Sequence, residues 1–198
     1  MNVNVLLLGP NQKNQEILYR FFIEDGCKVK TFEEKLSIDH KFLFEYDFLI
    51  SYGYQHILKS EILKYFKNKA INLHISYLPW NRGADPNLWS IINDTPKGVT
   101  IHLIDSGIDT GHILYQKEVW FDDNDTLYSS YQKLHSEIID LFKLNWINIK
   151  SGHARPDKQK GHGSFHLARE KDKFKKFLTN GWDTKLGDIK KLCNIYED

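Results

Sequence analysis

The sequence predicts an α/β fold: a doubly wound, mainly parallel twisted sheet with helices on both faces, followed by a short C-terminal helical extension. Three observations carry this prediction. Short apolar runs, continuous enough to be buried on both faces, alternate with segments of helical periodicity. Glycine and proline stand between them as turn signals. The length of 198 residues suits one such domain with a short extension.

The apolar runs are expected to form six strands, and the first four are separated by helical or turn segments. This β-α-β alternation favours parallel pairing, because a parallel connection needs a crossover segment. The predicted strands are residues 3–8, 27–32, 46–51, 70–75, 99–104 and 113–120.

Four segments show helical spacing or helix start signals. Residues 14–22 place apolar side chains on one face, and Gly26 ends that helix. Residues 60–66 begin with a serine cap, and residues 86–93 begin at a proline that Asp85 would cap. Residues 125–149 form a long amphipathic helix. Its predicted apolar side consists of Leu127, Tyr131, Leu134, Ile138, Leu141, Leu144 and Trp146.

The chain after this long helix has a different composition. Residues 151–164 are polar and contain glycines and Pro156, so we expect a loop or linker. Residues 165–198 are rich in lysine and predicted to be helical. The sequence thus predicts a catalytic domain over residues 1–150 and, over residues 151–198, a linker with a short helical extension.

Composition excludes several classes of protein. The formal net charge is +1, so no large nucleic-acid or membrane footprint is expected. The N-terminal apolar run has no positive region before it, and is interpreted as a strand and not as a signal peptide. Without a secretory signal, Cys27 and Cys193 are expected to be reduced thiols in the cytoplasm.

Polar side chains interrupt the strand over residues 70–75 and the loop after residue 104. Asn72 and His74 are two residues apart, so a strand places both on one face. Asp109 lies in a loop between Gly107 and Gly111. Acyl transfer to an amine can use three such groups: an amide that stabilises an oxyanion, an imidazole that transfers protons and a carboxylate beside the imidazole. Taken singly, each also fits a structural role: a strand-end asparagine, a satisfied interior histidine and a turn aspartate.

The joint pattern resembles the formyltransferase family that uses 10-formyltetrahydrofolate, which implies a Rossmann-type sheet. The motifs are Asn-x-His-x-Ser-x-Leu-Pro, Arg-Gly-x-x-Pro, Gly-Val-Thr and Asp-Thr-Gly. The residues that match, in this order, are Asn72, His74, Ser76, Leu78, Pro79, Arg82, Gly83, Pro86, Gly98, Val99, Thr100, Asp109, Thr110 and Gly111.

The resemblance implies roles for three residues. His74 would exchange a proton with the amine, and Asn72 would donate an N–H to the formyl oxygen of a tetrahedral intermediate. Asp109 would hold the tautomer of His74 and favour its cation, and it could also anchor a water that relays protons. The co-substrate would be 10-formyltetrahydrofolate, without a metal. Its pterin would be held largely by main-chain groups, at the cofactor-binding positions His56, Ile57, Leu58, Asp105, Gly107 and Ile108.

The same resemblance suggests where the acceptor binds. The expected substrate-binding residues are Ser76, Trp80, Arg82, Gly83 and His102. Alternatives stay open for two of them. Arg82 could hold an anion such as phosphate or pair with a nearby acid. His102 could point toward the acceptor or be a polar core residue. Gly83 would let the main chain approach a substrate closely.

The acceptor predicted by the pattern after Arg82 is the primary amine of a nucleotide-linked amino sugar, since Asn87-Leu88-Trp89-Ser90 looks like the sugar enzymes. Glycinamide ribonucleotide is the alternative, although its enzyme has a phosphate-binding Gly-Ser loop where this chain has Gly9-Pro10-Asn11. The tRNA enzyme carries a large C-terminal domain, whereas about fifty residues follow the long helix here. Two other kinds of function stay open: a hydrolase that releases formate, and a folate-binding module without catalysis. The extension over residues 151–198 could pair two subunits as a homodimer.

Overall fold

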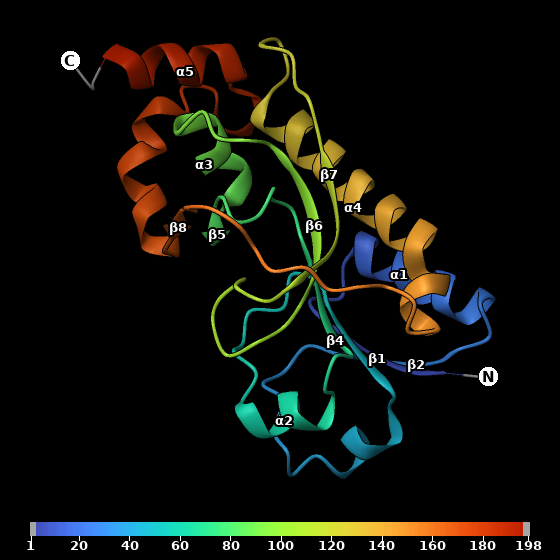
Figure 1. The fold of residues 1–198 in the computed structure, drawn as a ribbon. Helices are drawn as coiled ribbons and strands as arrows, with labels where there is room; N and C mark the ends of the chain where they lie inside the picture. The colour runs from blue at the N-terminus through green and yellow to red at the C-terminus, as the bar shows by residue number, and fades with distance from the viewer. Residues whose placement is uncertain (1–2, 196–198) are drawn as a thin grey trace.

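The computed structural model describes residues 3–195, and of residues 176–177 and 193–195 it describes only the main chain. A six-stranded sheet forms the centre of the molecule (Figure 1). Its strand order is β2-β1-β3-β4-β6-β7. The strands are β1 (Asn4–Leu8), β2 (Lys28–Phe32), β3 (Phe48–Ser51), β4 (Ala70–His74), β6 (Gly98–Leu103) and β7 (Ile113–Glu118).

Strand direction reverses at β6 and again at β7. Strands β2, β1, β3 and β4 are parallel, whereas β6 pairs antiparallel with β4 and β7 antiparallel with β6. The predicted fold class is confirmed, and the antiparallel part is the two-strand edge after the β-α-β units. Because β1, β3 and β4 run the same way, their carboxyl ends meet at one edge, where ligand sites of such sheets lie.

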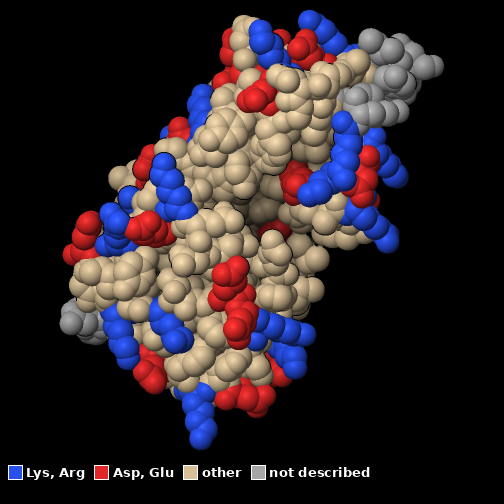
Figure 2. Space-filling model, turned by 180° about the vertical axis from the view of Figure 1, so that it is seen from behind, with Lys and Arg blue, Asp and Glu red and all other residues tan. Residues whose placement is uncertain are grey.

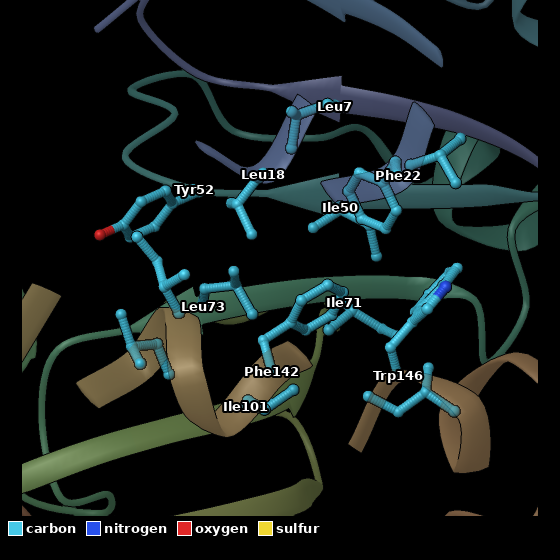
Figure 3. Close-up of a cluster of buried hydrophobic side chains, with 14 of the residues drawn as sticks. Leu7, Leu18, Phe22, Ile50, Tyr52, Ile71, Leu73, Ile101, Phe142 and Trp146 are labelled. Atoms are coloured by element: carbon cyan, nitrogen blue, oxygen red, sulfur yellow. The ribbon is translucent and has the colours of Figure 1, made fainter. Parts of the chain in front are cut away.

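Two helices cover one face of the sheet, and the main core lies beneath them. Helices α1 (Lys13–Glu24) and α4 (Leu127–Lys150) pack there through Phe22, Phe142 and Trp146, which contact one another at right angles or at a tilt (Figure 3). The opposite face carries the 3₁₀ turn η1 (Lys41–Glu45) and helix α2 (Ser60–Tyr65), over a smaller apolar cluster. Both faces of β1 and β3 are therefore buried, which explains their uninterrupted apolar sequence.

Three local predictions are wrong. Ser60 is the first residue of α2 and does not cap it: Lys59 holds the cap position, without a side-chain bond. Asp85 does hold the cap position of α3 (Pro86–Ile92), but in a left-handed conformation, and its carboxylate pairs with Lys171 at 3.2 Å instead. Leu144 is 77% exposed, because the buried stripe of α4 runs through Ile139, Phe142 and Ile149.

The segment after α4 folds back over the domain as a polar loop followed by short elements. Strand β8 (Phe165–His166) pairs in parallel with β5 (Arg82–Gly83). The 3₁₀ segments η2 (Ala168–Phe177) and η3 (Gly181–Asp183) lead to α5 (Leu186–Ile195). Helix α5 buries Leu186 and Ile189 against Leu88 and Ile91 of α3. Residues 196–198 of the predicted extension lie outside the described residues, as does the side chain of Cys193. The thiol of Cys27 is free and buried.

Candidate active site

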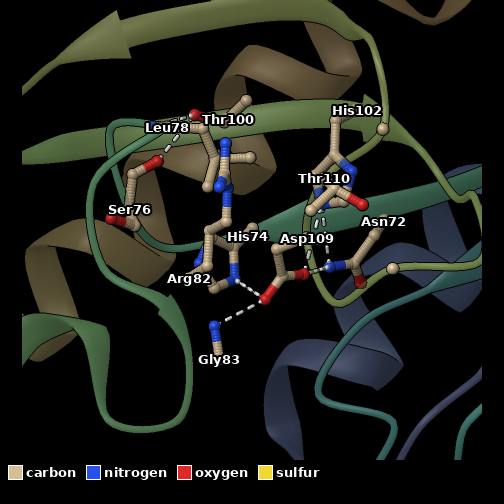
Figure 4. A network of polar contacts seen from close by, with 12 residues as sticks. Asn72, His74, Ser76, Leu78, Arg82, Gly83, Thr100, His102, Asp109 and Thr110 are labelled. Carbon is tan, nitrogen blue, oxygen red and sulfur yellow. Dashed lines mark hydrogen bonds and ion pairs between the residues drawn. The ribbon is translucent and has the colours of Figure 1, made fainter. Parts of the chain in front are cut away.

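Strands β4 and β6 bring three polar side chains together near the carboxyl edge. Asn72 and His74 are separated by one residue on β4, so alternation puts both on one face, as predicted. The antiparallel register sets His102 of β6 directly opposite Asn72 and Thr100 opposite His74. The imidazoles of His74 and His102 lie edge to face, with their ring centres 6.2 Å apart (Figure 4).

Asp109 reaches these side chains from the loop between β6 and β7. Its Oδ1 accepts from the Asn72 amide at 3.1 Å, and its Oδ2 accepts from the main-chain N–H of Gly83 at 2.9 Å. Its backbone is left-handed, with φ of 52°, an uncommon conformation for a residue other than glycine. Beyond it the loop packs so tightly that a Cβ on Gly111 would lie 1.7 Å from the Leu103 carbonyl oxygen. The loop therefore places the Asp109 carboxylate against side chains of β4 and β6 and against the main-chain N–H of Gly83.

One ring nitrogen of His74 makes a hydrogen bond within the described residues, and the other faces a carboxylate. Nε2 donates to the main-chain oxygen of Asn81 at 3.2 Å, and Nδ1 faces Asp109 Oδ2 at 3.8 Å. A carbonyl oxygen can only accept, so the neutral ring carries its hydrogen on Nε2, and Nδ1 presents a lone pair. Protonation at Nδ1 would therefore point an N–H at the carboxylate.

The charge of Asp109 favours the cation of His74, but burial of the imidazole acts more strongly in the opposite direction. The side chain is buried, and burial lowers the pKa of His74 below its usual range, although the charge of Asp109 and the bond to Asn81 act the other way. Desolvation of the cation outweighs the pairing, because the carboxylate is not in hydrogen-bond contact with the ring. His74 is therefore a neutral base at neutral pH, with a carboxylate beside it.

The Asn72 amide is already engaged inside the cluster. Its Nδ2 lies 3.1 Å from Asp109 Oδ1 and 3.2 Å from His102 Nε2. His102 Nδ1 donates to the Leu103 carbonyl at 2.8 Å, so in the neutral ring Nε2 is an acceptor for the second amide hydrogen. The donor predicted for the formyl oxygen thus holds Asp109 and His102 in this structure.

Asp109 is a carboxylate throughout the physiological range. Burial by itself would raise the pKa of Asp109, but the neighbouring imidazoles and the Gly83 N–H hold it well below its usual range. Its side chain is 12% exposed. A fixed negative charge at this depth stabilises any positive charge that develops on His74.

The cluster opens into a cavity of about 810 Å³, within the size range of small-molecule sites. Figure 2 shows a hollow near the middle of the face it draws, surrounded mostly by residues other than Lys, Arg, Asp and Glu. Asn72, His74 and Asp109 line the cavity. So do these predicted cofactor and substrate residues: His56, Ile57, Leu58, Asp105, Gly107, Ile108, Gly83 and His102.

The loops at residues 56–58 and 105–108 border the cavity with exposed apolar side chains and with main-chain groups. Ile57 is 73% exposed and Ile108 is 45% exposed, so two large apolar side chains border the cavity uncovered. The main-chain groups of Ile57 and Leu58 make no hydrogen bond to other residues of the described part. The Asp105 carboxylate, by contrast, accepts from Gly107 N and Thr110 Oγ1 within its own loop.

Three predicted substrate residues do not line the cavity. Ser76 is buried and donates to the Trp80 carbonyl at 2.6 Å. Arg82 Nε and Nη2 both donate to Gln159 Oε1, at 3.1 and 2.7 Å. The structure gives these side chains internal partners, and Trp80 contributes its main chain. The motif residue Thr100 likewise donates to the Ser76 carbonyl and accepts from Leu78 N, which fixes the turn after β4 (Figure 4).

The close main-chain contact at Gly83 is with another strand of the protein, whereas the sequence suggested a contact with a substrate. Its φ is +87°, and a Cβ there would lie 2.4 Å from the His166 carbonyl oxygen and 2.9 Å from the Phe165 ring. The close neighbour is thus strand β8 and not a ligand. The Gly83 N–H is nevertheless part of the site, because it binds Asp109.

Sequence reasoning missed two residues that hold the site. Asn81 is fully buried and left-handed, receives the His74 hydrogen bond and bonds Thr95 and Ser164. Its place in the Pro79–Pro86 loop was the available signal. Gln159 donates through Nε2 to the main-chain oxygens of Asp109 and Gly111, both at 2.8 Å. It lies in a polar linker without periodicity, so no local signal marks it.

The described residues contain no group of three or more His, Cys, Asp or Glu that could hold a metal. His166 instead stacks on Trp89 with ring centres 4.0 Å apart. No helix within residues 3–195 is long and apolar enough to cross a membrane.

Known proteins match this chain over most of its length. Residues 10–142 match the family described as Formyl transferase. The formyltransferase PseJ from Anoxybacillus kamchatkensis, solved with UDP-4,6-dideoxy-4-formamido-L-AltNAc and tetrahydrofolate, is 46% identical. That match covers 94% of this chain and 97% of the other, with a TM-score of 0.90. A sugar N-formyltransferase from Shewanella sp. FDAARGOS_354 shares the fold at 21% identity and a TM-score of 0.80, over 96% of this chain and 87% of that one.

Curated sequences give a second group of relatives. The methionyl-tRNA formyltransferase of Clostridium tetani is 33% identical over 91% of this chain. That of Thermodesulfovibrio yellowstonii is 38% identical over 64% of this chain. The chain spans only about half the length of these relatives, 55% and 41% respectively.

Proposed function

The chain belongs to the formyl transferase family, and from this premise we propose that it moves the formyl group of 10-formyltetrahydrofolate to the primary amine of a nucleotide-linked amino sugar. The observation that carries the proposal is the contact set of Asn72, His74 and Asp109 inside one cavity. The likeness to PseJ over nearly the full length of both chains supports the sugar acceptor.

We assign the proton transfers to His74. Its neutral Nδ1 accepts the proton that the attacking amine must lose, and Asp109 Oδ2 stabilises the imidazolium that forms. The same proton then passes to the nitrogen that leaves the formyl carbon. One C–N bond forms and one breaks, so no net proton is taken from the protein.

We assign the oxyanion contact to Asn72. An N–H donor matters most where negative charge develops, and removing one such donor in comparable sites costs about 3–4 kcal/mol. The hydrogen now directed at His102 Nε2 is the one available to the formyl oxygen, since the contact to Asp109 keeps the carboxylate in place.

We propose that the formyl donor lies between residues 56–58 and 105–108. The co-substrate supplies a formyl group bound to a nitrogen that can leave. Ile57 and Ile108 would cover its pterin, and free main-chain groups of Ile57 and Leu58 would bond its polar edge. No metal is part of this proposal.

We propose that residues 1–150 are the catalytic domain and that residues 151–198 act as a linker and helical support for it. Gln159 and strand β8 are the contacts that support this division of roles. A cytoplasmic location and a homodimer stay predictions. Sedimentation of the purified chain would test the second.

The deciding experiment incubates the protein with 10-formyltetrahydrofolate and a panel of amines. The panel contains UDP- and dTDP-linked amino sugars and glycinamide ribonucleotide, and each product is scored by mass for one added formyl group. We expect formylation of a sugar nucleotide. Formylation of glycinamide ribonucleotide alone, or formate release that needs no amine, would overturn the proposal in favour of purine synthesis or a hydrolase.

A further inference from the structure

A single peptide unit joins the ring of His74 to the C-terminal segment. The unit that links Asn81 to Arg82 presents its carbonyl oxygen to His74 Nε2 at 3.2 Å, and its N–H donates to the main-chain oxygen of Ser164 at 3.0 Å. The C=O and N–H of a planar trans peptide point in opposite directions. His74 and Ser164 therefore lie at the two ends of this unit, and each bond fixes the direction of the other.

The side chain of Asn81 holds the same unit from a second direction. Asn81 is fully buried, and its Nδ2 donates to Thr95 Oγ1 at 2.8 Å. The Ser164 hydroxyl accepts from the Asn81 main-chain N–H at 2.8 Å and donates to Asn81 Oδ1 at 3.2 Å. The backbone of Asn81 is left-handed, with φ of 55°, a conformation in which asparagine is enriched. We call Asn81, Thr95 and Ser164 the carbonyl clamp.

The chain on either side of the clamp is also fixed. The Trp80 carbonyl, one residue before, accepts from the Ser76 hydroxyl at 2.6 Å. Gly163 packs so closely against the turn after β4 that a Cβ there would lie 2.0 Å from the Pro79 carbonyl oxygen. The carbonyl that faces His74 is thus held within a closely packed region and cannot turn as it could in an exposed loop.

Two acceptors compete for the hydrogen of the neutral His74 ring. The Asn81 carbonyl lies 3.2 Å from Nε2, and Asp109 Oδ2 lies 3.8 Å from Nδ1 (Figure 4). At equal distance a carboxylate is the stronger acceptor, so an unrestrained ring beside Asp109 would carry its hydrogen on Nδ1. Here only the carbonyl is within hydrogen-bond distance. The position of the Asn81 carbonyl therefore decides the competition in favour of Nε2.

We propose that the carbonyl clamp, and not Asp109, selects the working tautomer of His74, so that Asn81, Thr95 and Ser164 are positioning residues for the reaction. The resemblance to the formyltransferases gave this role to Asp109. The inference rests on the proposed function for its effect on turnover, because Nδ1 must carry a lone pair to take the proton of the amine. Asp109 then acts on the imidazolium that forms, and the clamp acts on the neutral ring.

The tautomer can be measured without turnover. Long-range proton–nitrogen NMR spectra of protein with nitrogen-15-labelled histidine distinguish a ring nitrogen that carries hydrogen from one that carries a lone pair. They are recorded at about pH 8, above the ordinary pKa of histidine, and His74→Gln identifies the His74 signals. Asn81→Gly keeps the left-handed backbone and the carbonyl but removes the side chain, and Ser164→Ala removes the hydroxyl. Ser151→Ala, at the exposed end of α4, is the control.

A further pair of variants separates the hydrogen bond of the clamp from its packing. Thr95→Val keeps the volume of the side chain and removes the acceptor for Asn81 Nδ2, whereas Thr95→Ser keeps the hydroxyl and loses only a methyl group. A role in positioning predicts that the valine variant loses the tautomer and that the serine variant retains it.

The wild-type spectrum should show the His74 hydrogen on Nε2. In Asn81→Gly, Ser164→Ala and Thr95→Val, part of the population should carry it on Nδ1. With 10-formyltetrahydrofolate and UDP-4-amino-4,6-dideoxy-L-AltNAc, the amine that corresponds to the product bound by PseJ, kcat should fall about tenfold, in proportion to the fraction that keeps Nδ1 free. No clamp residue lines the cavity, so both KM values should change less than about threefold. Thr95→Ser and Ser151→Ala should match the wild type.

The outcomes separate this inference from the proposed function. A wild-type His74 with its hydrogen on Nδ1, or an unchanged tautomer in all three clamp variants, would overturn the inference whatever happens to kcat. A variant that unfolds is recognised in the same spectra, and the other two then decide. A shifted tautomer in a protein that formylates none of the amines would end the proposed function and leave the clamp as the group that sets the His74 ring.

Discussion

The side chain of Gln159 holds the catalytic loop through the main-chain oxygen of Asp109, 50 residues earlier, at 2.8 Å. Its oxygen accepts from Arg82, so one amide joins the Asp109 loop to strand β5. We expect Gln159→Ala to lower kcat about tenfold to hundredfold with little change in either KM, since Asp109 moves but the cavity stays. Lys158→Ala, on the exposed neighbour, is the control, and stopped-flow and steady-state rates are the measurement. Equal changes in kcat and in folate affinity would indicate a general structural role.

His74→Gln and Asp109→Asn should each reduce kcat by about 10²-fold to 10⁴-fold, the range for a general base and for the group that supports it. Circular dichroism should show an unchanged fold, because both side chains are at the cavity wall. Full turnover in both purified variants would refute the assigned roles.

The pH dependence of kcat/KM should follow the amine and not His74. Because burial keeps His74 neutral, the rate should rise with pH toward and above neutrality as the acceptor amine loses its proton. An acceptor with a less basic amine should shift this rise to lower pH by the difference in amine pKa. A rise that stays in place when the amine is changed would assign it to the protein, and a flat profile would contradict the mechanism where chemistry limits turnover.

His135 should make stability depend on pH below 6.5. Its pKa is about 4 in the folded protein and about 6.5 unfolded, so the folded state binds fewer protons. The contribution is complete above pH 6.5 and decreases as the pH falls toward 4, by about 3 kcal/mol at most. Urea unfolding at pH 7.5 and pH 4.5 should show a smaller difference in His135→Gln than in the wild type. His153→Gln, at an exposed site, should keep the wild-type difference, and equal differences in both variants would contradict the prediction.

Gly83→Ala should destabilise the protein more than Gly152→Ala, although both glycines have a positive φ. A Cβ at residue 152 meets nothing within 4 Å, so only the backbone cost of about 1–2 kcal/mol applies. At residue 83 the Cβ would also lie 2.4 Å from the His166 oxygen, so β5 and β8 must separate and Asp109 loses an N–H donor. Chemical denaturation and kcat are the measurements. Similar losses of stability in the two variants would show that β5 and β8 can separate at little cost in free energy.

Much of the fold was predictable from the apolar runs. A strand that is covered on both faces of the sheet needs apolar side chains at every position, as at Phe48–Ser51. Leu144 was misplaced because it was counted as a core residue for being apolar, although it is two residues from both Phe142 and Trp146 and so lies on the opposite side of the helix. The pairing of Asn72 with His74 follows from strand alternation alone. Asn81 and Gln159 were not predictable in this way, since each acts through contacts with segments distant in sequence.

The parallel pairing of β5 with β8 has a consequence for biosynthesis. Residues 82–83 are made early, but their partners at 165–166 follow more than eighty residues later. During translation the amide of Gly83 therefore has no neighbouring strand until nearly the whole chain has left the ribosome. A nascent chain halted at residue 150 would contain every strand of the central sheet but not Gln159, so the main-chain oxygens of Asp109 and Gly111 would lack the amide that bonds them.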